Sequence, residues 1–425
     1  MSPTPSALPR PLRAFLLCNG ITTAVCLLTE LICWWMHLPE TYLNPFFVGY
    51  RFFDFDSYQQ RFTALHTPAF FALDKPWPFS YPAPAAVVYA TFFSAGPDYS
   101  LSCFLAFAIA SALVVAGLFG RALRQRGLSL RASIGWPAAV LALAYPFWFC
   151  FQRANIEIVA FLLIAAGLCA FTTRRPYLAA VCFGLDASLK VVPVLFLALF
   201  LSRRQYRHFA VGLLVAGAAN VAALAFIGPT TLEAWHGLSH GFQAFHRELQ
   251  QGFNPNAIGF DHTLLSLYRR FVPITPAFTS ILSNYTLVGA LLGTVLYFTI
   301  IRRLPFLNQV LALGAAALLL PPVSFEYTLI HLYAALGLLA LTIVEGTPQA
   351  WPRMMPFLVV LALLLSPLSE LILHGVRFGG QIKCLLLIAL MVLALVRRLP
   401  SHFDPAAEAT AHAVDRELME VTAAP

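Results

Sequence analysis

The chain has 425 residues, of which 59% are hydrophobic and 11% charged, and its formal net charge is +8. A soluble domain of this length needs more charged surface, so the composition excludes a soluble globular protein and indicates an integral membrane protein. The basic residues are spread over separate short loops, which argues against nucleic acid as a partner.

Long apolar segments recur from residue 14 to residue 396. Each is close to the roughly 20 residues that cross about 30 Å of hydrocarbon as a helix. We therefore predict an all-α, polytopic integral membrane protein with about twelve transmembrane helices. The predicted parts are a cytoplasmic N-terminus (1–13), a transmembrane domain (14–396) and a cytoplasmic tail (397–425). Within residues 83–119, SAGPD divides a short apolar run from a longer one, and we predict one broken or tilted crossing there.

The positions of arginine and lysine predict how the protein is oriented in the membrane, because cytoplasmic loops hold an excess of both. Their clusters lie at residues 10–13, 121–131, 174–175, 203–207, 302–303, 353 and 397–398. With all of these inside, the outward segments are 37–82, 151–155, 186–190, 228–282, 323–331 and 373–380. Both termini are then cytoplasmic. Segments 37–82 and 228–282 become the two large outer loops.

The first outer loop contains FFDFDSYQQRF, which puts Asp54 and Asp56 beside aromatic residues at the membrane surface. Carboxylates this close to hydrocarbon are costly unless they pair or do chemistry, so they predict a functional site. DFD also has the form of a DxD motif, which holds a divalent ion and a nucleotide sugar in soluble glycosyltransferases. That interpretation needs a nucleotide-binding α/β domain, and we find no glycine-rich strand-to-helix turn. We therefore expect no cofactor, with a divalent metal ion at DFD as the alternative.

Three further outward segments interrupt apolar sequence with polar residues. FQRANIEIV contributes Arg153 and Asn155, either as a wetted turn or as part of a site. In GLDASLKVVP, Asp186 and Lys190 are four apart and would pair on a helix. Alternatively, Lys190 offers a cation to an anionic headgroup.

In PPVSFEYTLIHLYAAL, Glu326 and His331 lie at the top of a predicted span. A histidine at this position can bind a phosphate, share a proton, or be buried without a role in function.

The outer loop 228–282 has two features of its own. His236 and His240 have the spacing of zinc ligands on a helix, but HExxH is absent and a solvated helix face explains the spacing as well. NPNAIGF, which includes Asn256, is typical of a loop that leads into a surface helix and contacts an acceptor.

Together the outward residues predict one site that combines an acid or base with several cations. A carboxylate can take the proton of an attacking hydroxyl. Fixed cations can stabilise the charge that develops on a leaving phosphate. This combination suits the transfer of a group from a lipid phosphate or diphosphate.

The order DFDSY, FSYPAPAAVVY, QRANIEIV, GLDASLKVVP, NPNAIGF and SFEYTLIHLYAAL resembles a known family over about residues 14–340. That family is the bacterial polyprenyl-phosphate-mannose-dependent alpha-mannosyltransferases of the glycosyltransferase C superfamily. The resemblance implies an all-helical fold with an extracytoplasmic first loop. It also implies a polyprenyl-phosphate sugar donor and inversion at the anomeric carbon.

By this resemblance Asp54 matches the catalytic aspartate, because Tyr58 stands where the motif has its tyrosine. Tyr81 and Pro82 match the YPP element, in which Ala83 replaces the second proline. Asn155 agrees with the GQxN element, whereas Arg153 replaces its glutamine. Lys190 and Pro193 match the KxxP element, and His331 matches a histidine near a later helix break.

The sequence thus predicts a membrane glycosyltransferase of a bacterial inner membrane with its site facing outward. It would move a sugar, by resemblance mannose, from a polyprenyl-phosphate donor to a glycan or glycolipid acceptor. Asp54 is the predicted base, and Lys190, Arg153 and His331 are predicted to bind the donor phosphate. The predicted substrate contacts are Asp56, Tyr58, Tyr81, Asn155, Asn256 and Glu326.

Two alternatives come from other classes of protein. A lipid transporter or flippase needs charges deep inside several spans, and Glu30 alone has that position in the sequence. A structural membrane protein whose loops bind a partner does not account for phosphate-compatible groups in separate outward loops.

Overall fold

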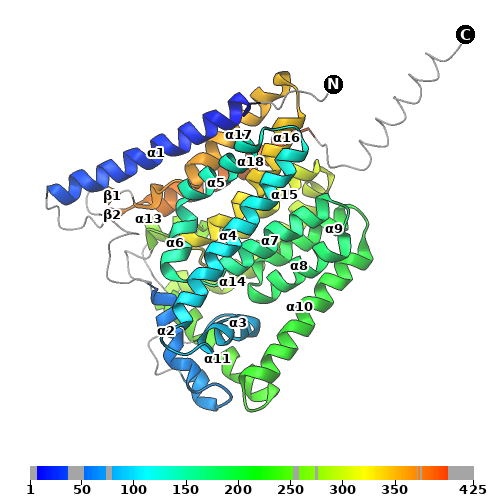
Figure 1. The fold of residues 1–425 in the computed structure, drawn as a ribbon. Helices are drawn as coiled ribbons and strands as arrows, with labels where there is room; N and C mark the ends of the chain where they lie inside the picture. Colours follow the sequence, from blue (N-terminus) through cyan, green and yellow to red (C-terminus); the bar gives the residue numbers. More distant parts are fainter. Residues whose placement is uncertain are drawn as a thin grey trace, which may run out of the picture.

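The computed structural model describes residues 7–36, 52–72, 79–251, 258–272, 276–370, 372–373 and 376–400. Over these residues the fold is helical except for one antiparallel hairpin, β1 (Ile372–Leu373) with β2 (Val376–Arg377). Figure 1 shows the helices as a bundle with shorter helices at one end. The predicted helical membrane protein is confirmed at this level.

The bounds of the elements are as follows. The first half contains α1 (Arg10–Trp35), α2 (Phe53–Phe62), η1 (Pro68–Phe71), α3 (Ala83–Phe93), α4 (Ser100–Gln125), α5 (Leu130–Leu143), α6 (Tyr145–Arg153), α7 (Glu157–Thr172), α8 (Pro176–Leu189), η2 (Val192–Leu197), α9 (Ala198–Ser202) and α10 (Tyr206–Ile227). The second half contains α11 (Thr231–Gln251), α13 (Leu264–Phe271), α14 (Pro276–Thr299), η3 (Ile301–Arg303), α15 (Phe306–Leu319), η4 (Glu326–His331), α16 (Leu332–Glu345), η5 (Pro348–Ala350), α17 (Trp351–Leu364), η6 (Leu368–Glu370) and α18 (Gly379–Val396).

The number of complete spans differs from the predicted number. Among the described residues, six helical stretches are long and apolar enough to cross a membrane, or seven if α5 and α6, bent by 61°, form one span. The prediction of about twelve spans is therefore not confirmed. Several apolar segments fold as shorter helices, such as α7 with 16 residues and α8 with 14. At about 1.5 Å per residue these are shorter than a hydrocarbon core of roughly 30 Å.

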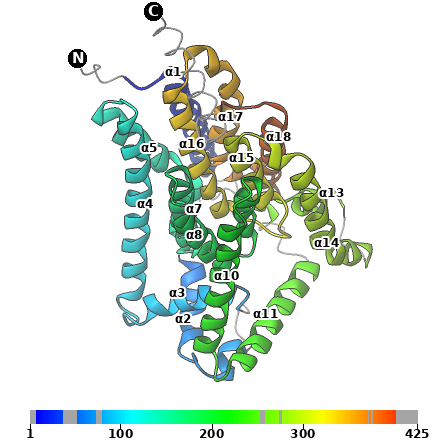
Figure 2. The same ribbon diagram turned by 90° about the vertical axis from the view of Figure 1, so that its right-hand side faces the viewer.

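Residues 83–119 form two separate helices. α4 alone is long enough to cross a membrane, whereas α3 is a helix of 11 residues. The turn between them includes Gly96, whose φ of 86° suits glycine. In Figure 2, α4 runs along one side of the molecule, and α3 lies near one of its ends.

The centre of the bundle is the antiparallel pair α7 and α8, joined by a short turn at Arg174 and Arg175. α10 packs against α8, while α4 and α16 pack against α7 (Figure 2). Because two antiparallel helices of similar length begin and end at the same level, the start of α7 and the end of α8 meet. Glu157 and Lys190 are thereby brought together at the end of the pair opposite the two arginines.

Candidate active site

Asp54 is the centre of a group of polar side chains from separate elements. It lies in the first turn of α2, and its side chain is 12% exposed. Arg153, the last residue of α6, donates from Nη2 to Oδ1 at 2.6 Å and from Nε to Oδ2 at 3.3 Å. Asn155 donates from Nδ2 to Oδ2 at 2.7 Å. Three donors therefore fix the orientation of this carboxylate.

The backbone around this group has two residues in the left-handed region. Phe52, which precedes α2, has φ 59°, and Ala154, which ends α6, has φ 47°. This conformation costs residues other than glycine about 1–2 kcal/mol. The Phe52 N–H also donates to the Gln152 carbonyl at 2.7 Å, which joins α2 to α6. Such strain is found where the surrounding structure fixes a functional geometry.

The structure separates the two carboxylates of DFD. Asp56 is exposed on α2, whereas Asp54 is directed to Arg153 and Asn155. Across the described ranges, no group of three or more His, Cys, Asp or Glu side chains is arranged to hold a metal ion. His236 and His240, whose spacing fits either zinc ligands or a solvated helix face, are both exposed on α11.

The tyrosines of the first loop line the site and support it. The Tyr81 hydroxyl accepts a hydrogen bond from Asn155 Nδ2 at 3.1 Å. Burial, and then the nearby Asp54 carboxylate, raise the pKa of Tyr81, so its phenol keeps its proton and can donate it. Tyr58 is buried against the rings of Phe79 and Tyr81, with centroids 5.3 and 5.9 Å away. Burial is also the main cause that raises the pKa of Tyr58.

Two predicted phosphate ligands meet at a third residue, Glu157. Lys190 Nζ lies 2.5 Å from Glu157 Oε2, and His331 Nε2 lies 3.0 Å from Glu157 Oε1. The side chains of Lys190 and His331 are 21% and 8% exposed, whereas that of Glu157 is 1% exposed. Asn155 connects this group to the first, because its Oδ1 accepts from the Glu157 N–H at 2.9 Å.

The predicted pair of Asp186 with Lys190 does not form. α8 ends at Leu189, and Lys190 has an extended backbone with φ −143° and ψ 129°, so the helical spacing is lost. Pro193 follows within η2 and prevents α8 from continuing as a regular helix. Lys190 pairs with Glu157 instead. The Asp186 side chain is buried, and its oxygens have no hydrogen-bond partner among the described residues.

Glu326 belongs to a different buried network. Its carboxylate forms an ion pair with Lys383 of α18 and accepts from the Ser369 hydroxyl. Both charged side chains are 0% exposed. The structure therefore does not bring Glu326 into the group around Asp54. Asn256 and the Glu30 side chain lie outside what the structure describes, so their predicted roles stay predictions.

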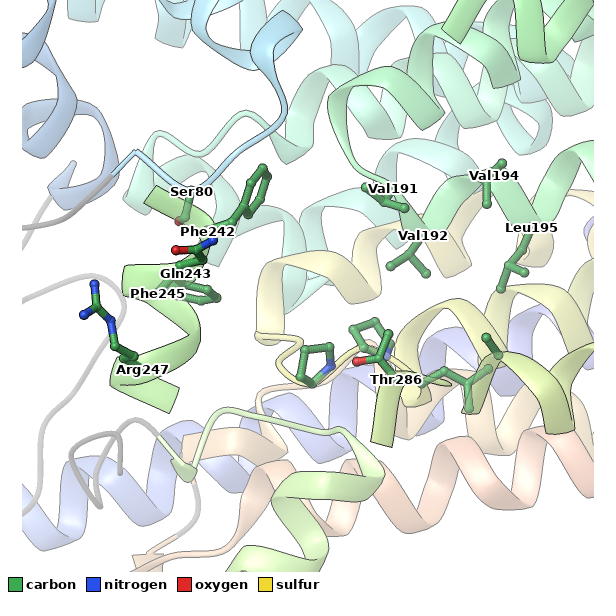
Figure 3. A pocket seen from close by; sticks show the side chains of 14 residues that line it. Ser80, Val191, Val192, Val194, Leu195, Phe242, Gln243, Phe245, Arg247 and Thr286 are labelled. Atoms are coloured by element: carbon green, nitrogen blue, oxygen red, sulfur yellow. The ribbon is translucent and has the colours of Figure 1, made fainter. Parts of the chain in front are cut away.

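A large apolar cavity lies beside the charged residues. It has a volume of about 970 Å³ and includes Ser80, next to Tyr81, and Val191, next to Lys190. Figure 3 shows Ser80 and α11 side chains on one side, with Val191, Val192, Val194 and Leu195 on the other. Arg247 and Gln243 of α11 add polar groups to the lining. A second apolar cavity, of about 560 Å³, shares Leu195, Ala290 and Leu320 with the first.

Two residues of this site were not among the predicted ones. Glu157 lies in FQRANIEIV but was not predicted to belong to the site, although a carboxylate that begins an apolar helix is the signal that could have identified it. Tyr327 has a ring centroid 5.3 Å from Lys190 Nζ. Only the folded chain brings this aromatic residue to the lysine.

The model of glycosyltransferase family 87 matches residues 79–322, which is more than half of the chain. This segment includes the residues from Tyr81 to Lys190 that form much of the site. No curated protein and no solved structure matches the chain.

Proposed function

The chain belongs to glycosyltransferase family 87, and from that premise we propose that this membrane glycosyltransferase takes its sugar from a polyprenyl-phosphate donor. The sugar is mannose, the acceptor is a hydroxyl of a glycan or glycolipid, and the anomeric carbon is inverted. A glycosyltransferase family favours this function over the transport of a lipid.

The observation that carries the proposal is the position of Asp54 near a lysine, a histidine and an apolar cavity. Asp54 belongs to one hydrogen-bonded group, and Lys190 and His331 belong to the adjoining group at Glu157. Val191, the residue after Lys190, lines the 970 Å³ cavity. A substrate with an anionic head and a long apolar tail matches this combination of charge and apolar space.

The proposed reaction is a single displacement. The acceptor oxygen attacks the anomeric carbon while Asp54 takes the hydroxyl proton. The bond from the anomeric carbon to the phosphate oxygen breaks, and its electron pair stays on the phosphate. The phosphate thereby gains a negative charge, which Lys190 and His331 stabilise. Attack opposite the leaving group inverts the anomeric centre.

Arg153 has a different position from the one predicted for a phosphate ligand. Two of its nitrogens donate to Asp54. We propose that Arg153 orients the base, and that contact with the donor phosphate is left to its remaining N–H groups. Arg153 and Lys190 supply positive charge here and His331 adds a ring N–H, so we propose a reaction without a metal ion or other cofactor.

We also propose that the site faces the outside of a bacterial inner membrane. Arg174 and Arg175 lie in the turn at the opposite end of α7 and α8 from Glu157 and Lys190. Arginine-rich turns are typical of the cytoplasmic side, so the site is assigned to the other side. On this orientation the first outer loop and the loop 228–282 flank the site, and both termini are cytoplasmic.

The test is transfer of labelled sugar from polyprenyl-phosphate-mannose by the purified protein in lipid. Asp54→Asn is expected to lower transfer by about 10²- to 10⁴-fold, the usual contribution of a general base. Asp56→Asn is the matched control, because this exposed carboxylate is only two residues away. Full transfer by Asp54→Asn would refute the role of Asp54. Loss of transfer both in Asp56→Asn and with EDTA would support the alternative metal site at DFD.

A further inference from the structure

Three groups from three parts of the chain surround the Lys190 ammonium. Glu157 Oε2, at the start of α7, lies 2.5 Å from Nζ. The ring centroid of Tyr81, before α3, lies 5.0 Å from Nζ, and that of Tyr327, in η4, lies 5.3 Å away. Both distances are within the range of a cation–π contact. We call Glu157, Tyr81 and Tyr327 the lysine seat.

Glu157 can act on a substrate only through other residues. Its side chain is 1% exposed, whereas those of Lys190 and His331, which it contacts, are more exposed. The Lys190 ammonium and the His331 ring stabilise this buried carboxylate, and the carboxylate holds both side chains at fixed positions in return. The Asn155 side chain accepts from the Glu157 N–H, so the start of α7 is fixed as well.

Tyr327 is itself packed against other aromatic rings. Its side chain is 9% exposed, and its ring stacks on Phe149 with a centroid distance of 6.1 Å. The ring of Phe325 lies at the same distance on a tilted plane. A lysine has a flexible four-carbon side chain and binds as a point charge, so it needs such neighbours to stay in one position.

We propose that Glu157 and Tyr327 are positioning residues that hold the Lys190 ammonium where it meets the phosphate of the donor. The inference rests on the proposed function, because it assigns to Lys190 the donor phosphate. Neither residue contacts the reacting atoms. Each increases donor affinity by reducing the motion that Lys190 would lose on binding.

Tyr327→Leu and Tyr327→Phe form the first matched pair of variants. Phe keeps the aromatic face and loses only the hydroxyl, whereas Leu loses the face. Tyr327→Leu is expected to raise the donor KM about fivefold or more, as a desolvated cation–π contact allows, with an unchanged acceptor KM. Tyr327→Phe is expected to keep the donor KM of the wild type. Equal donor KM values for the Leu and Phe variants would overturn the role of Tyr327.

Glu157→Gln tests the carboxylate, because it keeps the shape of the side chain and removes its charge. We expect it to raise the donor KM about tenfold, with a smaller change in kcat. In the double variant with Lys190→Ala, the rise in donor KM should be less than the product of the two single effects, because both act through the same ammonium. A rise equal to that product would overturn the role of Glu157.

Binding of a short-chain polyprenyl phosphate without sugar separates this inference from the proposed function. Wild type is expected to bind it at least fivefold more tightly than Glu157→Gln or Tyr327→Leu. That difference, seen together with no transfer from polyprenyl-phosphate-mannose, would uphold the lysine seat and refute the proposed donor. Equal binding by the three proteins, or no binding by any, would refute the claim that Glu157 and Tyr327 hold the Lys190 ammonium. Should Glu157→Gln fail to fold, the two Tyr327 variants still give the answer.

Discussion

Asn155 and Asp54 are joined by a hydrogen bond of 2.7 Å from the side-chain amide to Oδ2. The other end of the same amide accepts from the Glu157 N–H at 2.9 Å. One side chain thus donates to the proposed base and accepts from the residue that contacts Lys190 and His331. The two parts of the site are built around it.

Asn155→Ala should therefore lower kcat by about tenfold or more, because Asp54 loses a donor that orients it. It should also destabilise the protein by about 1 kcal/mol, because the N–H of Glu157, the first residue of α7, loses its hydrogen-bond acceptor. Asn155→Asp is the control, since it keeps an oxygen that accepts from the Glu157 N–H and places a second carboxylate against Asp54. We expect it to keep the thermal stability better than Ala while losing transfer. A wild-type kcat in Asn155→Ala would contradict this account.

Arg153 is predicted to act on kcat more than on donor affinity. Its two bonds to Asp54 need the planar fork of a guanidinium, which lysine does not have. Arg153→Lys should reduce kcat about tenfold, and Arg153→Ala should reduce it further. Steady-state kinetics with both substrates will check this. A higher donor KM with an unchanged kcat would instead support the phosphate contact predicted from the sequence.

The buried pair of Glu326 with Lys383 is expected to stabilise the fold without affecting the site directly. Glu326→Gln leaves Lys383 charged and unpaired at 0% exposure, which should cost about 3–5 kcal/mol of folding stability. The double variant Glu326→Gln with Lys383→Met removes both charges and should recover most of the loss. Thermal unfolding in detergent measures both effects. If the single variant instead keeps its stability and changes the substrate KM, the predicted substrate contact of Glu326 is supported.

Asp261 and His262 are expected to make the folding stability of the protein depend on pH. Asp261 Oδ1 accepts from the N–H groups of Thr263 and Ser324. Burial raises the pKa of Asp261 from 3.8 to about 7. The Asp261 carboxyl therefore binds its proton more tightly in the folded protein than in the unfolded chain. Its contribution to stability is complete below pH 3.8 and is lost as the pH rises towards 7. Burial lowers the pKa of His262 from 6.5 to about 3, and its stabilisation is lost as the pH falls from 6.5 towards 3.

These two residues oppose each other between about pH 4 and pH 6.5. Asp261→Asn keeps the oxygen that accepts the two backbone bonds and removes the titration, so His262 alone remains. The Tm of this variant should therefore rise with pH over this range more steeply than that of the wild type. Thermal unfolding at several pH values checks this. Parallel curves for the two proteins would show that Asp261 does not titrate as its burial suggests.

The cavities predict a dependence on the length of the donor lipid. Ala290 lines both cavities, and Ala290→Phe would fill space where they meet. We expect a higher KM for donors with long chains and little change for donors with chains of one or two isoprene units. Transfer assays with a series of chain lengths provide the comparison. An equal change for all lengths would place the lipid elsewhere.

The sequence predicted those features of the protein that leave a local signal in the chain. Apolar segments identified a helical membrane protein, because each backbone group in hydrocarbon must bond within its own helix. The prediction of about twelve spans from the same segments is not confirmed, since an apolar run such as α7 or α8 does not by itself reveal the length of its helix. The sequence also identified polar residues of the candidate site, because they stand out beside apolar or aromatic neighbours. Asp54, Arg153, Asn155 and Lys190 each interrupt apolar sequence, and the structure brings all of them together.

The partners of these residues were decided only by the tertiary structure. The sequence suggested Asp186 as the partner of Lys190 from their spacing, but that spacing has meaning only inside a continuous helix, and α8 ends before the lysine. Glu157 became the partner because α7 and α8 are antiparallel and meet at one end. By itself the sequence determined the class of protein and the chemistry available to it, because composition and polar interruptions are local. Only the tertiary structure decided which carboxylate faces which cation, because that depends on how helices distant in the sequence pack together.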